Sequence, residues 1–113
     1  MFKESSKEFE KLSNKKKPFV AYIQTASNHI PFTMPDKKES YRPLNDNEIE
    51  KNLLEESGFK SVAQLNALRY LDFNIGKFLE RAKKAGYYQN TIYAFFWRSQ
   101  YNYEKNKKLL KRV

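Results

Sequence analysis

The fold is decided by residues 61–86, which read SVAQLNALRYLDFNIGKFLERAKKAG. Their first four residues form a capping box, in which glutamine follows serine by three positions, as is typical of a helix N-terminus. Glycine at position 86 is typical of the residue that ends a helix. Between these limits, apolar residues recur at steps of three and four: Leu65, Leu68, Leu71, Ile75, Phe78, Leu79 and Ala82. The sequence therefore predicts one long amphipathic helix.

Two short apolar segments flank this helix and are predicted to be β-strands. Residues 19–26 are mostly apolar and follow a proline, and residues 91–97 are β-branched and aromatic. A right-handed crossover through the helix would make the two strands parallel. We therefore predict an α/β fold with a βαβ unit of parallel strands plus flanking helices. Two parallel strands leave edges and faces uncovered, so the unit is expected to belong to a larger domain and to self-associate when alone.

The other segments are predicted to be helical or irregular. Residues 2–14 form a weakly amphipathic pattern that ends before Pro18, because proline disfavours helix in the residue ahead of it. Residues 47–56 are predicted to form a short helix. Residues 27–47 contain three of the four prolines and are predicted to form a long loop, which starts where the first strand ends.

Three segments of the chain resemble one enzyme family, in the same order. Residues 18–32 read PFVAYIQTASNHIPF and contain a Ser-Asn-His-x-Pro-Phe core, and residues 65–78 contain the pattern Tyr-x-Asp-x-x-x-Gly-x-Phe. Residues 86–92 resemble the turn into the next strand. The family is that of the sulfatases and the lipoteichoic-acid-synthase-like phosphoglycerol transferases, within the alkaline phosphatase superfamily. The resemblance implies that residues 1–96 are the C-terminal part of a sulfatase-like catalytic domain with a partial alkaline-phosphatase-like fold.

The resemblance also implies an activity for the parent enzyme. Family members act on phosphate or sulfate esters with a threonine or formylglycine nucleophile and a divalent metal such as manganese, magnesium or calcium. The nucleophile and most metal ligands are expected upstream of Met1, so no catalytic residue, metal ligand or cofactor is assigned to this chain, which is expected to be inactive alone. The parent is expected in a bacterial cell membrane, with its catalytic domain outside the cytoplasm.

His29 is the substrate-binding candidate in this chain. By resemblance it matches the family histidine that contacts the phosphate or sulfate group, where a donor imidazole would offset charge on the transferred group. A solvent-facing loop histidine is the simpler interpretation of the residue alone, and the surrounding motif favours the substrate contact. Arg69 and Asp72 lie three apart on the long helix and are predicted to form an ion pair.

The predicted second strand changes character after Phe96. Members of the family continue with Gly-Asp-His at this point, whereas this chain continues with Trp97. Removal of one thymine ahead of the tryptophan codon would restore glycine, and it would restore Asp-His if Arg98 is encoded by CGA and Ser99 by TCA. We therefore predict that residues 97–113 are a basic tail read out of frame.

The net charge of +9 allows a second interpretation. Residues 98–113 hold six basic residues and one acidic residue, so they carry +5 and residues 1–97 carry the remaining +4. The alternative is a small basic protein that contacts nucleic acid or anionic lipid through this tail. If the chain is instead a fragment of a sulfatase-like enzyme, we expect it to bind no specific nucleic acid. No apolar run reaches the ~20 residues of a membrane span and no signal peptide is evident, so the chain as written is expected to be cytoplasmic.

Overall fold

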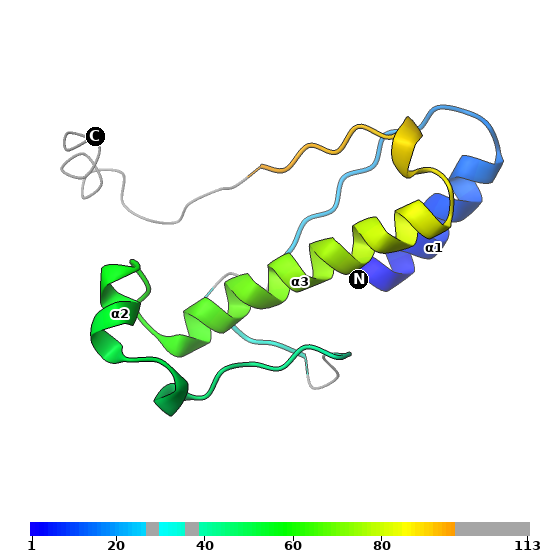
Figure 1. The fold of residues 1–113 in the computed structure, drawn as a ribbon. Coiled ribbons are helices and arrows are strands. Elements are labelled where there is room, and N and C mark those ends of the chain that lie inside the picture. Colours follow the sequence, from blue (N-terminus) through cyan, green and yellow to red (C-terminus); the bar gives the residue numbers. More distant parts are fainter. Residues whose placement is uncertain (27–29, 36–38, 97–113) are drawn as a thin grey trace, which may run out of the picture.

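The computed structural model describes residues 1–26, 30–35 and 39–96 (Figure 1). The described chain contains three α-helices, α1 at Phe2–Asn14, α2 at Lys51–Glu56 and α3 at Val62–Lys84. Two short 3-10 turns are η1 at Asp46–Glu48 and η2 at Tyr88–Asn90. Figure 1 shows α3 as the long central element, with α1 beside its C-terminal half and α2 beyond its N-terminal end.

Helix α3 begins and ends as the sequence predicts. The Ser61 hydroxyl oxygen accepts the N–H of Gln64 at 3.1 Å, and the Gln64 side-chain oxygen accepts the N–H of Lys60 at 2.8 Å. At the other end, Gly86 has a φ of 81° and donates its N–H to the Lys83 carbonyl at 3.1 Å. This left-handed conformation favours glycine because a side chain would be strained there. The long helix is therefore confirmed.

Helix α1 confirms the helix predicted at residues 2–14, and it packs on α3 through aromatic side chains. The ring of Phe78, which is 5% exposed, lies 5.8 Å from the Phe2 ring and 5.7 Å from the Phe9 ring. Phe9 also contacts Phe19 at 5.7 Å, and Phe78 contacts Tyr93 at 6.4 Å. Aromatic pairs at such separations each contribute about 1 kcal/mol beyond their buried area. This cluster joins both helices to the segments that follow them.

Residues 39–45 run along α3 in the direction opposite to the helix. Successive contacts step backward along α3, from Glu39 with Arg81 at 3.0 Å, through Tyr41 with Phe73 at a ring separation of 5.5 Å, to Leu44 with Asn66 at 2.8 Å. The loop predicted at residues 27–47 is thus irregular over most of its described part, yet fixed to the helix.

The predicted βαβ unit does not form within the described residues. Residues 18–26 and 91–96 are drawn as extended coil in Figure 1, and the structure records no strand ladder there. Val20 is 100% exposed, Ile92 96% and Phe96 90%. An extended segment becomes a strand only when its N–H and C=O groups pair with a neighbouring strand, and the described chain does not supply that neighbour.

The short helix predicted at residues 47–56 is interrupted. Turn η1 ends at Glu48, Ile49 is extended with φ −139° and ψ 135°, and α2 begins only at Lys51. The Glu48 carboxylate accepts the N–H of Asn45 at 2.6 Å and so stabilises the start of η1, while the extended backbone of Ile49 separates this turn from α2.

The apolar face predicted for α3 is only partly covered. Phe78 and Ala82 are buried, whereas the other predicted residues of this face are half-buried: Leu65, Leu68, Leu71, Ile75 and Leu79. The strands expected to cover this face form no sheet, so few side chains reach it. The helix therefore retains apolar surface for further packing. No helix within the described ranges is long and apolar enough to cross a membrane.

Candidate functional site

The site predicted from the sequence lies at the ends of the two extended segments. His29 falls among residues 27–29, which lie outside the described residues, as does everything after Phe96. The structure therefore does not place His29, and its predicted substrate contact stays a prediction. The tail proposed to bind nucleic acid or lipid also lies outside the described chain.

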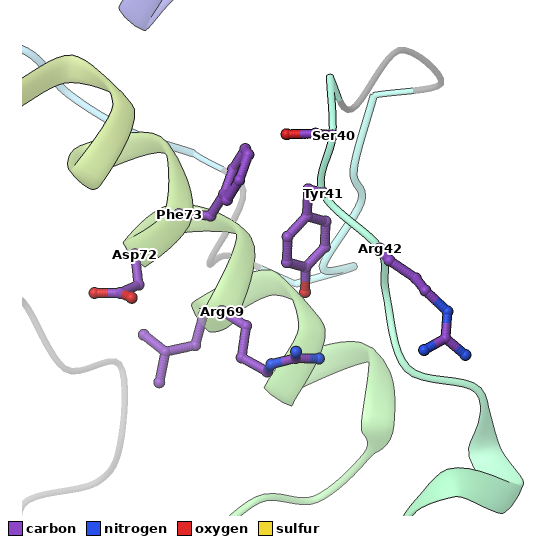
Figure 2. A pocket seen from close by; sticks show the side chains of 7 residues that line it. Ser40, Tyr41, Arg42, Arg69, Asp72 and Phe73 are labelled. Atoms are coloured by element: carbon purple, nitrogen blue, oxygen red, sulfur yellow. The ribbon is translucent and has the colours of Figure 1, made fainter. Parts of the chain in front are cut away.

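A hollow in the described chain lies between α3 and residues 40–42. It encloses about 740 Å³ and is open to solvent on one side. Its lining residues are Ser40, Tyr41, Arg42, Leu68, Arg69, Asp72 and Phe73. Figure 2 shows Tyr41 between Phe73 and Arg42, with its hydroxyl directed toward Arg69, whereas Asp72 points away from it.

Asn66 fixes this hollow by holding the loop against α3. Its side-chain oxygen accepts the N–H of Leu44 at 2.8 Å, and its side-chain nitrogen donates to the Leu44 carbonyl at 2.8 Å. Tyr41 donates its hydroxyl to the Asn66 carbonyl at 3.1 Å. One buried amide thereby satisfies both backbone groups of Leu44, as a neighbouring strand would.

Sequence reasoning missed both Asn66 and Tyr41. A signal was present for Asn66, because an asparagine next to the apolar positions of an otherwise favourable helix needs a hydrogen-bond partner when buried. Tyr41 offered a weaker signal, an aromatic residue within a polar, proline-containing loop. Neither signal indicates which backbone group the side chain will meet.

The ion pair predicted between Arg69 and Asp72 is wrong. The Arg69 guanidinium lies 5.8 Å from the Tyr41 ring centre and donates to the Asn66 side-chain oxygen at 3.5 Å, a long contact. The guanidinium therefore contacts the Tyr41 ring and the Asn66 side-chain oxygen instead of the Asp72 carboxylate. Burial raises the pKa of the Tyr41 hydroxyl, and the nearby Arg69 charge opposes that rise.

The side chains of this hollow do not form a catalytic site. Asp72 is the carboxylate among its described lining residues, and these include no histidine or second carboxylate that could act as a base for Ser40. Across the part of the chain that the structure describes, no three His, Cys, Asp or Glu residues gather in a way that could hold a metal ion. The hollow therefore anchors the loop and offers no acid–base pair.

Comparison with known proteins identifies the family. The family model for sulfatases matches residues 1–96. The chain belongs to the sulfatase family. Lipoteichoic acid synthase 1 from Bacillus subtilis (strain 168) is 32% identical over 84 residues, which are 73% of this chain and 11% of that relative. The predicted resemblance to sulfatases and lipoteichoic-acid-synthase-like proteins is thus confirmed.

Membership of the sulfatase family places the chain in the alkaline-phosphatase-like α/β fold class. The chain spans about a tenth of the length of the curated relative it matches. No solved structure matches it significantly.

Proposed function

We propose that residues 1–96 form one part of a sulfatase-family catalytic domain that acts on phosphate esters and transfers phosphoglycerol groups. The family match over residues 1–96 and the similarity to a lipoteichoic acid synthase carry this proposal. The similarity favours phosphoglycerol transfer over sulfate-ester hydrolysis, because the relative is named for a synthase. The parent enzyme would be a bacterial membrane protein with this domain outside the cytoplasm.

The exposed extended segments support an incomplete domain. Residues 18–26 and 91–96 expose apolar side chains on both faces, as buried parallel strands would if their neighbours were absent. In the proposed complete domain these segments pair with further strands and form the βαβ unit around α3. The half-buried leucines of α3 would then pack beneath the sheet.

Within that domain, His29 is proposed to contact the transferred group. It follows residues 19–26, and ligands of open α/β sheets bind beyond the carboxyl ends of the strands. An imidazole N–H directed at a phosphoryl oxygen would stabilise the negative charge that grows there during transfer. His29 would therefore act on the substrate's charge.

The divalent metal of the family is proposed to be held by residues outside residues 1–96. The described residues do not fit such an ion, because they bring no cluster of carboxylate and imidazole ligands together. One Asp-His pair is proposed to follow residues 91–96 in the shifted reading frame. The family match ends at residue 96, where the sequence predicts the change of frame.

The test uses the complete enzyme, with the upstream region joined and the frame repaired after Phe96. His29→Ala should lower turnover of phosphatidylglycerol by about 100-fold, since a single donor at a developing charge contributes a factor of this order. Manganese affinity, measured by calorimetry, should change little. Thr33→Ala, an exposed position in the same loop, is the matched control. Parallel loss of metal affinity and turnover would make His29 a ligand or a structural residue and contradict the proposed role.

A further inference from the structure

Charged residues are distributed unevenly within residues 1–97. Residues 1–17 and 77–84, which hold α1 and the C-terminal part of α3, contain ten basic and four acidic residues and so carry +6. The rest of residues 1–97 holds six basic and eight acidic residues and carries −2. Since α1 lies beside this part of α3, the positive charge collects on one end of the helix pair (Figure 1).

A groove lies between the two helices at this end. It encloses about 320 Å³, and its lining includes Lys3 and Lys7 from α1 and Arg81 and Lys84 from α3. Glu10 is the carboxylate among its lining residues. Four basic side chains and one carboxylate therefore line the groove. Like charges that line one groove repel one another, so an anion that enters the groove is attracted to them.

The lysines of this groove form no salt bridges within the described residues, unlike other lysines on the same helices. Lys11 pairs with Glu8 at 2.7 Å, and Lys77 pairs with Glu80 at 3.2 Å. Lys3, Lys7 and Lys84 are exposed and form no salt bridge within the described ranges. Arg81 binds both carboxylate oxygens of Glu39 through one nitrogen, at 3.0 and 3.1 Å. These three cations therefore have no partner at salt-bridge distance among the described residues, although the charge of Lys7 helps to lower the pKa of Glu4.

The lining identifies the chemistry of that ligand. No aromatic residue lines the groove, so it lacks the stacking surface that single-stranded nucleic acid uses. Its volume is large enough to admit a phosphate group, and lysine ammonium groups bind phosphate as point charges. We propose that the groove between α1 and α3 binds a phosphate group, carried either by a lipid headgroup or by a free phosphate ester.

The experiment titrates the full 113-residue chain at low salt, where surface charge is least screened. Backbone NMR shifts of Lys3, Lys7 and Lys84 follow binding of inorganic phosphate, and sedimentation follows binding to vesicles with and without phosphatidylglycerol. Dependence on the groove lysines with inorganic phosphate supports a free ester. The same dependence only with phosphatidylglycerol vesicles supports a lipid headgroup.

Matched variants separate the groove from net charge. Lys3→Gln with Lys7→Gln should weaken binding by roughly tenfold or more, since each lysine near an anionic surface contributes about fivefold. Lys84→Gln should weaken it about fivefold, and Glu10→Gln should strengthen it. Lys107→Gln with Lys108→Gln removes the same charge from the tail and should change binding less than about twofold. Equal losses in the two double variants, or no binding of either probe, would overturn the proposal.

Discussion

Asn66 is the residue on which the attachment of the loop to α3 depends. Replacing it by leucine keeps its size but leaves the N–H and C=O of Leu44 unpaired. Each net hydrogen bond contributes about 1 kcal/mol, so Asn66→Leu should lower the free energy of unfolding by about 2 kcal/mol. Urea unfolding followed by circular dichroism measures this.

Asn74 provides the control for that prediction. It lies on the same helix and donates to the carbonyl of Tyr70 at 2.7 Å, a bond within α3. Asn74→Leu should therefore cost less than about 1 kcal/mol. Equal effects of the two substitutions would show that the contact with Leu44 contributes nothing particular to stability.

Tyr87 should make the chain less stable in alkali. Its side chain is 6% exposed, and its hydroxyl has no hydrogen-bond partner among the described residues. Burial raises the pKa of this hydroxyl above 10.0, and the neighbouring Tyr93 and Glu10 raise it further. The fold thus favours the neutral phenol, so its contribution to stability is present below about pH 10 and lost as the pH rises through the folded pKa.

Replacing Tyr87 by phenylalanine tests this reasoning. The variant removes a buried hydroxyl that has no partner, so it should raise the free energy of unfolding by about 1 kcal/mol at neutral pH. It should also reduce the loss of stability above about pH 10. Urea unfolding at both pH values gives the comparison. A variant less stable than the parent would show that the hydroxyl has a partner.

At the residue scale, sequence patterns predicted helix caps better than they predicted side-chain contacts. Ser61 and Gly86 act within a few residues of their partners, so their roles follow from local spacing. Asn66 instead meets Leu44, 22 residues away, and Arg69 turns to Tyr41 rather than to Asp72. Such choices depend on where the loop passes, which spacing does not encode.

At the element scale, the extended segments should exchange their amide protons quickly in the isolated chain. Residues 19–26 and 91–96 are extended but pair with no strand in the described structure, whereas α3 has its own ladder of hydrogen bonds. Hydrogen exchange should therefore show protection in α3 and little in these segments. In the complete domain both segments should become protected. Protection of both in a monomeric isolated chain, verified by sedimentation, would contradict the incomplete sheet.

The helices could be predicted because their sequence signals are local. Strands could not be predicted in the same way, because a strand also needs a partner segment to pair with. Apolar spacing gave α1 and α3 their faces, and both form as expected. The period and composition of residues 19–26 and 91–96 fit strands, but a ladder needs a second backbone at hydrogen-bonding distance. The side chains of Val20 and Ile92 are exposed because no neighbouring strand covers them in the described structure.

For the whole molecule, we predict that the isolated chain binds no catalytic metal tightly. The described residues gather no ligand cluster, and His29 is assigned to substrate. Titration with manganese should show only weak binding to scattered carboxylates, in the millimolar range or weaker, and no turnover of an aryl phosphate. A stoichiometric micromolar site, or metal-dependent cleavage that His29→Ala abolishes, would contradict this prediction.

The family could be predicted from the sequence because three motifs occur in the family's order, and the match over residues 1–96 confirms the family and its α/β class. The predicted βαβ unit is not formed by the described residues. The catalytic site could be predicted only in outline. His29 lies outside the described residues, and the other functional groups are assigned to segments that these residues do not contain. Motif spacing identifies such groups without fixing their geometry.

We predict that residues 91–96 are a sulfatase-family strand and that the reading frame shifts after Phe96, so that the unshifted frame, restored by removing one thymine, continues to Gly-Asp-His. Sequencing the coding DNA across codons 95–101 tests it most directly. We expect an unbroken thymine run through the Phe95 and Phe96 codons into the Trp97 codon, with CGA or AGA for Arg98 and TCA for Ser99. Any other codon for Arg98, such as CGT or AGG, or any other codon for Ser99, such as AGC, would contradict it, because the restored frame would then encode no Asp-His pair.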